Sequence, residues 1–571
     1  MADGVARRMA LGRAWRRLKA AVALLLPLGI ALGSPAGAQT AFPGTRANDP
    51  GSAPLIDRDR ADRLEPRIAP PVTPAAPPAP AASIALPADQ AADPPAAVLL
   101  TRVRYMGASL PAAVLDAAVA PSIGRPLTRD TLQTIARAVS DAYARSDIAF
   151  YAVSMPAQIP AGGQLIVRVV EGRVKDWRLA GLSPNVPTRL IQAQMKRILR
   201  DTPLRKSVLE RSLGLMRDIP GQTVDAQVRQ SGQPGELVMD LIVKRTQLRV
   251  GVTIDNSGVA NVVDGVQAQL AVTVNGVLRE GDSTRVAGYL PFYPDRYQYY
   301  ALSHSTPIGS DGTSVIGQVA RVDSRSRDGA IKGEATLAGA TVSHPLIRSN
   351  KTNLTVSASL DGVDSSNYFL DIRFGDYRSR ALRLAASWSR AQGKSGEAVS
   401  AVVSRGVKLL GARPFTGFSE SVFTKANVQA VAVRSLSRRL SLRLSARGQY
   451  SRDRLPVTER FSLGGRGAGM AFRLGARTAE QAIAGAVELS WTLPAKAPPL
   501  KEAALFAYAD QSATVGFDKV RAGGDGADRS LLAPDAGGVP GTASPTARTR
   551  TVCNKVWARL RPAPLIASAP G

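Results

Sequence analysis

The residue types that most often carry covalent chemistry or metals are scarce in this chain. Two histidines, His304 and His344, and one cysteine, Cys553, occur among 571 residues. One cysteine can form neither an intramolecular disulfide nor a multi-cysteine zinc site. His304 lies between Ser303 and Ser305, but this pattern is nonspecific, and the sequence has no GxxxxGK[ST], HExxH or GxSxG motif. We therefore expect no enzyme activity, no cofactor and no metal.

The charged side chains indicate another kind of chemistry. The chain has 73 Lys and Arg against 45 Asp and Glu, a net charge of +28. Such a field attracts nucleic acid or anionic lipid. Because interleaved aromatic residues and any known nucleic-acid module are missing, we expect no nucleic-acid partner. Much of the charge alternates with apolar residues along predicted strands, which favours a cationic pore in contact with lipid head groups.

Residues 1–38 have the pattern of a secretory signal peptide. Basic residues precede an apolar run at 20–33, and Ala36 and Ala38 form a small-residue cleavage site before Gln39. A membrane anchor is the alternative, but the run is short and Pro27 interrupts it. The mature chain is therefore expected to begin outside the inner membrane.

Three segments that differ in composition and in the pattern of their apolar residues follow the signal peptide. Residues 39–97 are a Pro/Ala-rich linker, in which residues 55–67 form either a short charged helix or plain disorder. Residues 98–178 predict an α+β module: strands at 98–105, 150–155 and 165–170, with a helix capped by Thr128. Residues 179–246 repeat this plan, with amphipathic helices at 188–200 and 205–217 and strands at 224–228 and 237–244.

Residues 247–529 consist of two-faced strands. Leu248, Val250, Val252 and Ile254 alternate with polar residues, and later stretches repeat the pattern. Lipid outside and water inside a transmembrane barrel produce this alternation, although a soluble β-sandwich alternates in the same way. The signal peptide, the length of the region and its basic faces favour the barrel.

Short motifs in a fixed order resemble a known family. Residues 155–174 are similar to the end of a first POTRA domain, and they are followed by an Ile219-Pro220-Gly221 turn. A "DN-G" strand opening at 255–258, a "PLIRS" strand at 345–349 and an "RF-LGG" signature at 460–465 come next. In this order they resemble the two-partner secretion transporters of the haemolysin-activator type, within the Omp85 superfamily.

The resemblance implies a 16-stranded transmembrane antiparallel β-barrel, preceded by two small POTRA domains and a plug helix, for which residues 55–67 are the candidate. It places the protein in the outer membrane of a Gram-negative cell with its POTRA domains in the periplasm. The implied function is secretion of one large exoprotein, unfolded in the periplasm, through a barrel expected to be a monomer. An Omp85-type factor that inserts other outer-membrane proteins is the alternative, but that branch carries more POTRA modules. A passive porin would lack these modules.

Transport without a nucleotide site requires another mode of recognition. We expect a POTRA strand edge to pair with the exoprotein by β-augmentation, and the expected edges are residues 165–170 and 237–243. The candidate recognition residues are those of the POTRA motifs and the first of these strands: Pro156, Gln158, Gly163, Leu165, Val167, Val169, Glu171, Gly172, Pro220 and Gly221.

The chain departs from the family at the tip of its inward-folded loop. Where the family has Val-Arg-Gly-Phe/Tyr, this sequence has Gly469-Met470-Ala471-Phe472, so Met470 replaces the arginine. Asp510 matches the acid that the arginine faces, and Arg466 or Arg473 could supply the missing cation. The alternative is a solvated Asp510. The candidate pore residues are Gly464, Gly465, Arg466, Met470, Phe472, Arg473 and Asp510.

The C-terminal segment does not match a barrel that ends in a closing strand. Residues 530–571 are rich in proline and end in Gly571, and we predict no closing strand there. Since an open edge in lipid is costly, either another segment closes the barrel or this tail is atypical.

Overall fold

The computed structural model describes residues 98–156, 158, 161–181, 186–255, 267–291, 296–326, 329, 331–414, 419–463, 477–493, 500–515 and 551–562. The predicted signal peptide, linker and plug helix lie outside these residues, and so do the candidate pore residues Gly464 to Arg473.

The first module is a three-stranded sheet packed on helices. It contains β1 (Arg102–Met106), α3 (Ala112–Val119), α4 (Arg129–Arg145), β2 (Tyr151–Ser154) and β3 (Gln164–Glu171), with short 3-10 turns at Ala120–Ser122 and Ala161–Gly163. As predicted, Thr128 caps α4, and its hydroxyl accepts a hydrogen bond from the backbone N–H of Thr131 at 3.3 Å. The helix α3, which begins directly after Pro111, was not predicted from the sequence.

The second module repeats this plan. It contains β4 (Arg173–Ala180), α5 (Arg189–Arg200), α6 (Lys206–Arg217), β5 (Gln222–Gln230) and β6 (Glu236–Arg245). Both amphipathic helices were predicted at these positions. The predicted boundary between residues 178 and 179 falls inside β4, whose partner is β6 of the second sheet.

The strands that we expected to be edges lie in the centre of their sheets. The first sheet has the order β1-β3-β2 and the second the order β4-β6-β5. The prediction that residues 165–170 and 237–243 offer free edges is therefore wrong.

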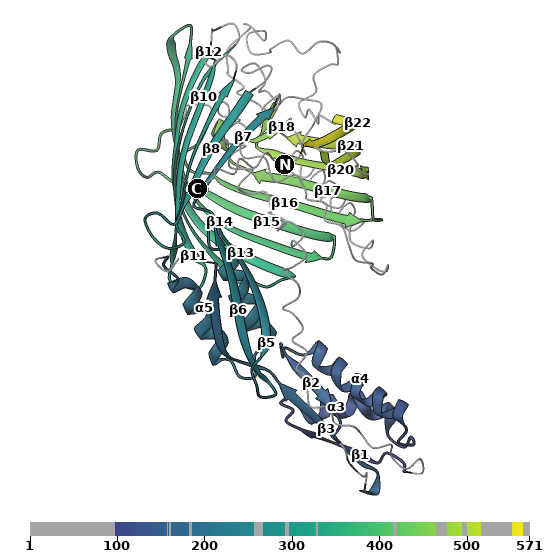
Figure 1. The fold of residues 1–571 in the computed structure, drawn as a ribbon. Helices are drawn as coiled ribbons and strands as arrows, with labels where there is room; N and C mark the ends of the chain where they lie inside the picture. Colours follow the sequence, from purple (N-terminus) through teal and green to yellow (C-terminus); the bar gives the residue numbers. More distant parts are fainter. Residues whose placement is uncertain are drawn as a thin grey trace. The chain divides into compact units, whose positions relative to one another are not determined.

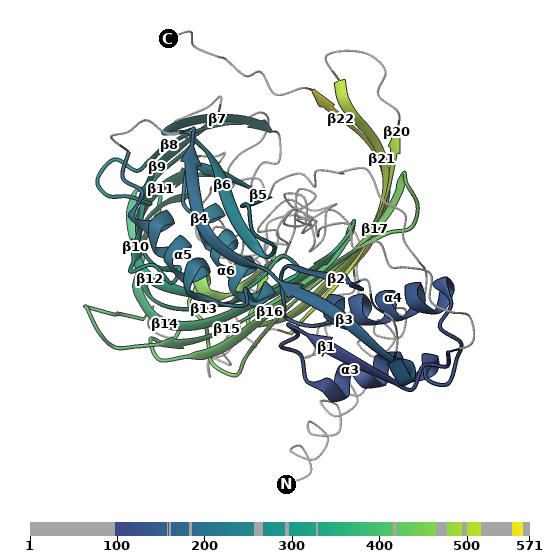
Figure 2. The same ribbon diagram turned by 60° about the horizontal axis from the view of Figure 1, so that its bottom comes forward.

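A large antiparallel sheet follows (Figures 1 and 2). Its order is β22-β21-β20-β17-β16-β15-β14-β13-β12-β11-β10-β9-β8-β7, fourteen strands in the part of the chain that is described. The strands are β7 (Leu248–Asp255), β8 (Gln267–Asn275), β9 (Ser283–Pro291), β10 (Tyr297–Ile308), β11 (Thr313–Arg325), β12 (Ile331–Arg348), β13 (Thr352–Phe369), β14 (Ile372–Gln392), β15 (Ser395–Gly406), β16 (Thr424–Ser435), β17 (Leu440–Ser451), β20 (Gln481–Leu493), β21 (Leu500–Val515) and β22 (Thr551–Pro562).

The two faces of the large sheet differ, as the alternation predicts. Apolar residues such as Val250, Leu302 and Leu384 are exposed on one face. The opposite face carries buried polar side chains, which alternate along the strands with the exposed apolar ones: Asp361, Ser379, Ser404, Lys425, Gln449 and Asp510. The sheet curls from β7 round to β22 (Figure 2). Because the polar residues are buried and the apolar residues are exposed, we assign the polar face to the concave side.

The hairpin of β13 and β14 is the longest in the sheet, with strands of 18 and 21 residues. Its tip is a two-residue turn at Leu370 and Asp371, both with positive φ, between the paired residues Phe369 and Ile372. Leu370 and Ile372 are exposed there.

The C-terminal tail contains a strand, β22, that the sequence did not reveal. Within the described strands it does not pair with β7, so the prediction that this tail holds no closing strand is not contradicted. β22 pairs antiparallel with β21, from Thr551 opposite Ser512 to Pro562 opposite Leu500. Within the described strands, β7 and β22 are the two ends of the sheet.

No helix within the described residues is long and apolar enough to cross a membrane.

Candidate functional site

The concave face carries a buried cluster of charges that the sequence analysis missed. Glu459 is 0% exposed and forms ion pairs with Arg383 of β14 at 2.8 Å and with Lys425 of β16 at 2.9 Å. Arg383 also pairs with Asp361 of β13 at 2.8 Å and donates to the hydroxyl of Ser404 at 2.8 Å. Two acids and two bases therefore balance each other at a buried site.

Backbone contacts extend this cluster. The ammonium of Lys425 donates to the carbonyl of Glu459 at 2.8 Å, and the amide of Gln449 on β17 donates to the same carbonyl at 3.1 Å. Gln449 also donates to the carbonyl of Glu480, whose carboxylate pairs with Arg460 at 3.1 Å. Removing one partner of a buried ion pair costs about 3–5 kcal/mol, because the other charge is left uncompensated.

Glu459 belongs to the segment that connects β17 to β20. This segment includes a 3-10 turn (Val457–Glu459), β18 (Phe461–Leu463) and β19 (Arg477–Ala479), and β18 pairs antiparallel with β19. Phe461 and Leu463 pack against Ala482 and Ala484 of β20. Leu455 packs against Ala381 and Phe423. The predicted "RF-LGG" signature thus begins directly after the buried glutamate.

Asp510 lies on the same face of the sheet as Gln449 and is 4% exposed. The hydroxyl of Tyr508 donates to its carboxylate at 3.2 Å. Since Arg466 and Arg473 lie outside the described residues, the predicted ion pair with Asp510 stays a prediction.

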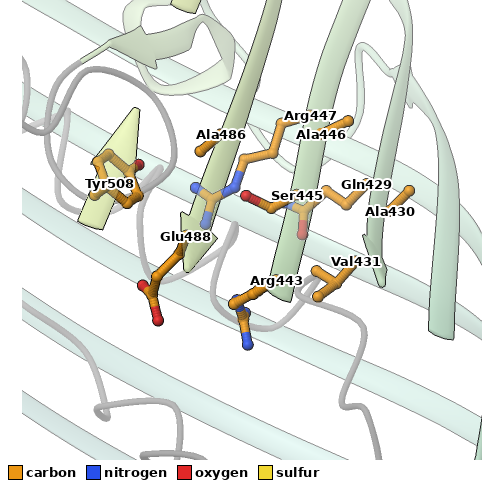
Figure 3. A pocket seen from close by; sticks show the side chains of 10 residues that line it. All are labelled: Gln429, Ala430, Val431, Arg443, Ser445, Ala446, Arg447, Ala486, Glu488 and Tyr508. Atoms are coloured by element: carbon orange, nitrogen blue, oxygen red, sulfur yellow. The ribbon is translucent and has the colours of Figure 1, made fainter. Parts of the chain in front are cut away.

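A pocket on this sheet is lined by residues of β16, β17, β20 and β21 (Figure 3). Arg443, Glu488 and Tyr508 form one row across β17, β20 and β21. Ala486, the cross-strand neighbour of Asp510, forms part of the pocket wall. In this pocket the positive charge of Arg443 and the negative charge of Glu488 therefore lie on neighbouring strands, next to the small side chain of Ala486.

The predicted recognition residues of the first module make contacts inside that module. Leu165, Val167 and Val169 are buried in its core. The side-chain amide of Gln158 donates to the carbonyl of Ile166 at 2.8 Å and accepts from its N–H at 2.7 Å, so that it substitutes for a neighbouring strand. Pro156 precedes this contact, and its carbonyl accepts a 3.3 Å hydrogen bond from Gln158.

Glu171 has three partners within the first module. It accepts hydrogen bonds from the backbone N–H of Ser109 at 2.8 Å, from the Ser109 hydroxyl at 2.7 Å and from the Tyr143 hydroxyl at 2.6 Å. Burial, together with the hydrogen bond to Glu171, raises the pKa of Tyr143 well above its usual value. Glu171 therefore ties the end of β3 to the helices.

The predicted glycines lie where backbones approach closely. A Cβ on Gly172 would lie 2.6 Å from the Cβ of Phe150, at the joint between the two modules. A Cβ on Gly163 would lie 2.1 Å from the carbonyl oxygen of Leu99. Gly221, which follows Pro220, has φ +71°, and a Cβ there would lie 2.6 Å from the carbonyl oxygen of Thr246. Close packing therefore explains why glycine is found at positions 163, 172 and 221.

The second module contacts the turns of the large sheet. The guanidinium of Arg348, at the end of β12, donates to both carboxylate oxygens of Asp218 at 2.7 and 2.8 Å. The carboxylate of Glu280, from the β8–β9 turn, accepts from the N–H groups of Arg189 and Leu190 at the start of α5. This is a favourable position for a carboxylate, because the first N–H groups of a helix lack intrahelical partners.

The two histidines lie within strands of the large sheet, His304 in β10 and His344 in β12. The Nδ1 atoms of His304 and His344 lie 2.8 Å from the hydroxyls of Thr284 and Thr313, respectively. The described residues contain no cluster of His, Cys, Asp and Glu that could hold a metal ion.

Comparison with known proteins identifies the family. A family model described as haemolysin secretion/activation protein ShlB/FhaC/HecB matches residues 237–537, more than half of the chain. The chain belongs to this family. A model of the ShlB-type POTRA domain matches residues 98–172. The protein is thus a two-partner secretion transporter of the outer membrane, with its POTRA domains in the periplasm.

Similar proteins agree with this assignment. The outer membrane transporter CdiB of Escherichia coli O6:K15:H31 (strain 536 / UPEC) is 24% identical over 421 residues, which cover 69% of each chain. The structure of CdiB from Escherichia coli has a TM-score of 0.62 and 19% identity, and the match covers 89% of this chain and 91% of that one. CdiB from Acinetobacter baumannii has a TM-score of 0.54 and 14% identity, covering 76% and 82%. The large sheet accordingly corresponds to the barrel of these transporters, and in the part of the chain that is described its two ends, β7 and β22, are not paired with each other.

Proposed function

We propose that this transporter recognises one large exoprotein through its POTRA domains and moves it, unfolded, through the barrel without ATP. Membership of a family of haemolysin secretion/activation proteins supports a role in protein secretion. The polar concave face supports the route, because a water-filled conduit lets an extended chain keep its backbone hydrated.

The observation that carries the recognition step is the outer edge of β5 beyond Val224, whose own carbonyl accepts a hydrogen bond from the guanidinium of Arg217 at 3.2 Å. In the described part of the second module, β5 is an edge strand of nine residues beside β6. Its first residue, Gln222, lines a pocket together with Pro220 and the β8–β9 turn. A chain paired with β5 would therefore reach the periplasmic end of the barrel.

The other edge strands suit pairing less well. β1 has five residues and exposes the charged side chains of Arg102 and Arg104. β2 has four residues, and beyond it the side-chain amide of Gln158 is hydrogen-bonded to the backbone N–H and carbonyl of Ile166. β4 carries a register shift between Val174 and Asp176 and exposes several charged side chains. Bulges and charges are the devices that protect sheet edges from strand addition. β5 thus offers the best template for β-augmentation.

Site-specific photo-crosslinking tests this proposal. A photoreactive amino acid replaces Gln227, an exposed residue of β5, and the matched control replaces Arg178, an exposed residue of β4. We expect the exoprotein encoded beside this gene to crosslink at position 227 and not at 178. Crosslinks of equal yield at both positions would contradict the choice of β5.

A separate experiment tests the energy source. Purified transporter in lipid vesicles should translocate the unfolded exoprotein, as measured by protease protection, in the absence of nucleotide. The alternative function, insertion of other outer-membrane proteins, predicts a different phenotype on gene deletion: exoprotein secretion would persist, while other barrels would be lost from the membrane.

A further inference from the structure

The outward face of the large sheet, which is the one with the exposed apolar residues, changes from apolar to charged along its strands. On β13 the outward positions Leu354, Val356, Ala358 and Leu360 are apolar, and Asp364 is the first charged one. From Leu354 to Asp364 the strand is about 33 Å long at about 3.3 Å per residue, which is about 25 Å across the membrane at a tilt of about 40°. This is the height of a barrel's apolar band, so Asp364 lies at the level of the lipid head groups.

These head groups belong to the outer leaflet, because the second POTRA domain contacts the opposite ends of the strands. The N–H of Asn350, in the β12–β13 turn, donates to the carboxylate of Glu210 at 3.1 Å. The guanidinium of Arg197 donates to the hydroxyl of Ser310, in the β10–β11 turn, at 3.0 Å. Since the POTRA domains are periplasmic, the end of the sheet that carries Asp364 faces the outside of the cell.

One row of outward side chains crosses four strands at the level of Asp364. Strand register places Arg321 of β11, Thr336 of β12, Asp364 of β13 and Arg378 of β14 opposite one another in turn. We call these four residues the arginine row. Neighbouring strands lie about 4.8 Å apart, so that the backbones of Arg321 and Arg378 are about 14 Å apart. The row therefore carries a cation at each end.

Acidic neighbours orient both arginines but leave donors available. The Nε and Nη2 atoms of Arg321 donate to Asp323 at 3.1 and 2.9 Å, and Nη2 also donates to Glu334 at 3.2 Å. Arg378 has an ion pair with Asp364 at 3.8 Å, and within the described residues its guanidinium makes no hydrogen bond. The side chains of Arg321 and Arg378 are 53% and 45% exposed. Both guanidinium groups can therefore bind a further anion.

Further cations surround the arginine row. Arg325 on β11, Lys332 on β12, Arg380 on β14 and Arg405 on β15 are outward residues near it. Cations outnumber acids among the described outward residues at this end of β11 to β15. The local charge therefore favours an anionic ligand.

We propose that the arginine row binds the phosphates of an anionic glycolipid in the outer leaflet, with the chemistry of lipid A. Arginine binds phosphate through paired hydrogen bonds, and clusters of basic residues beside a membrane recruit anionic lipid head groups. Val319, Leu360 and Leu382 are exposed next to the row on its membrane side and would contact the acyl chains. The inference rests on the family and its membrane location, and it is independent of the proposed transport function.

Native mass spectrometry of the purified transporter in detergent tests this proposal, with lipid A as the probe. Arg378→Gln removes one phosphate-binding guanidinium without breaking a hydrogen bond within the described residues. We expect the affinity for lipid A to fall about tenfold, because charge-assisted hydrogen bonds to phosphate are lost. The matched control is Arg434→Gln on β16, near the periplasmic end, where the arginine is also 45% exposed and pairs with Glu397. This variant should keep the parental affinity.

Arg321→Gln gives a second, independent measurement at the other end of the row. Heat-modifiable gel migration identifies the folded variants, and only these are compared. A folded Arg378→Gln or Arg321→Gln protein that binds lipid A as tightly as the Arg434→Gln protein does would overturn the arginine row.

Two competitors separate the sources of phosphate. Neither inorganic phosphate nor phosphatidylglycerol in excess should displace lipid A from the parental protein. Displacement by inorganic phosphate would show a site for free anions, and displacement by phosphatidylglycerol would show an unselective surface for anionic lipids. Either result would overturn the assignment to a glycolipid of the outer leaflet.

Discussion

Charged residues at the strand ends of the second POTRA domain show how single side chains fix its sheet. Glu236, at the start of β6, pairs with Lys175 at 2.8 Å and with Arg173 at 2.7 Å, both on the edge strand β4. The hydrogen bonds from Lys175 and Arg173 hold the pKa of Glu236 below its usual value. A folded-state pKa that is depressed stabilises the fold above the unfolded pKa and loses that contribution as the pH falls through the folded one.

We therefore predict a pH-dependent effect of Glu236→Gln. At pH 7 the variant should lose amide protection in β4 and β6, because the two cations lose their charged partner. As the pH falls below the ordinary pKa of a glutamate and through the lowered pKa of the folded state, the parental carboxylate protonates and the variant and the parent should converge. Hydrogen exchange followed by mass spectrometry on the full-length protein measures this. A difference that is constant from pH 3 to pH 7 would contradict the assigned cause.

The sequence predicted individual residues well only where their role is local. Thr128 was correctly assigned as a helix cap from its position before an amphipathic run. The cluster of Asp361, Arg383 and Glu459 was missed, because its members lie far apart in the chain and meet only through strand register. The motif residues Gln158 and Glu171 were visible as a pattern, but their internal contacts were not.

At the scale of elements, the joint between the POTRA domains depends on a close backbone approach. Phe150, which precedes β2, packs in the core of the second domain. The N–H of Gly172 donates to the carbonyl of Phe150 at 2.8 Å, and the carbonyl of Gly172 accepts from the N–H of Leu204 at 3.1 Å. The two domains thus share a core and a hydrogen-bonded connection.

We predict that Gly172→Ala loosens this joint. The added methyl group would lie 2.6 Å from the Cβ of Phe150, so that the backbones must separate. Overpacking of this kind costs about 1–3 kcal/mol. Limited proteolysis should show faster cleavage between the domains. The comparison variant is Gly317→Ala in β11, where a Cβ has open space, and it should behave as the parent does.

Helices were easier to predict than sheet order. The spacing of apolar residues located α5 and α6 to within a residue, because helical periodicity is a local property. Sheet order depends on which strand returns to which neighbour, so the central positions of β3 and β6 could not be deduced from their composition. β22 was missed because its alternation is short and lies among prolines.

At the scale of the whole molecule, POTRA 2 is fastened to the barrel through its helices. Arg348 lies in the motif that resembles the family's "PLIRS" strand, and its bidentate pair with Asp218 joins β12 to the end of α6. A guanidinium and a carboxylate in this arrangement fix orientation as well as distance.

We predict that Arg348→Lys weakens this attachment, because an ammonium cannot form both parallel hydrogen bonds. With Asp218 partly exposed, the loss should be modest, about 0.5–1 kcal/mol. Hydrogen exchange should increase in α6 and not in α4 of the first domain. Lys351→Arg, on the neighbouring turn, is the control. Unchanged exchange in α6 of the Arg348→Lys protein would show that other contacts fix the domain.

The length of β13 and β14 also has a consequence outside the cell. At about 3.3 Å per residue, strands of 18 and 21 residues are far longer than the roughly 25 Å apolar band of a barrel, even when tilted. POTRA 2 contacts the opposite ends of these strands, so the turn at Leu370 and Asp371 projects from the cell surface. Antibodies raised against this peptide should therefore stain intact bacteria, and an epitope tag inserted there offers a way to count transporters on living cells.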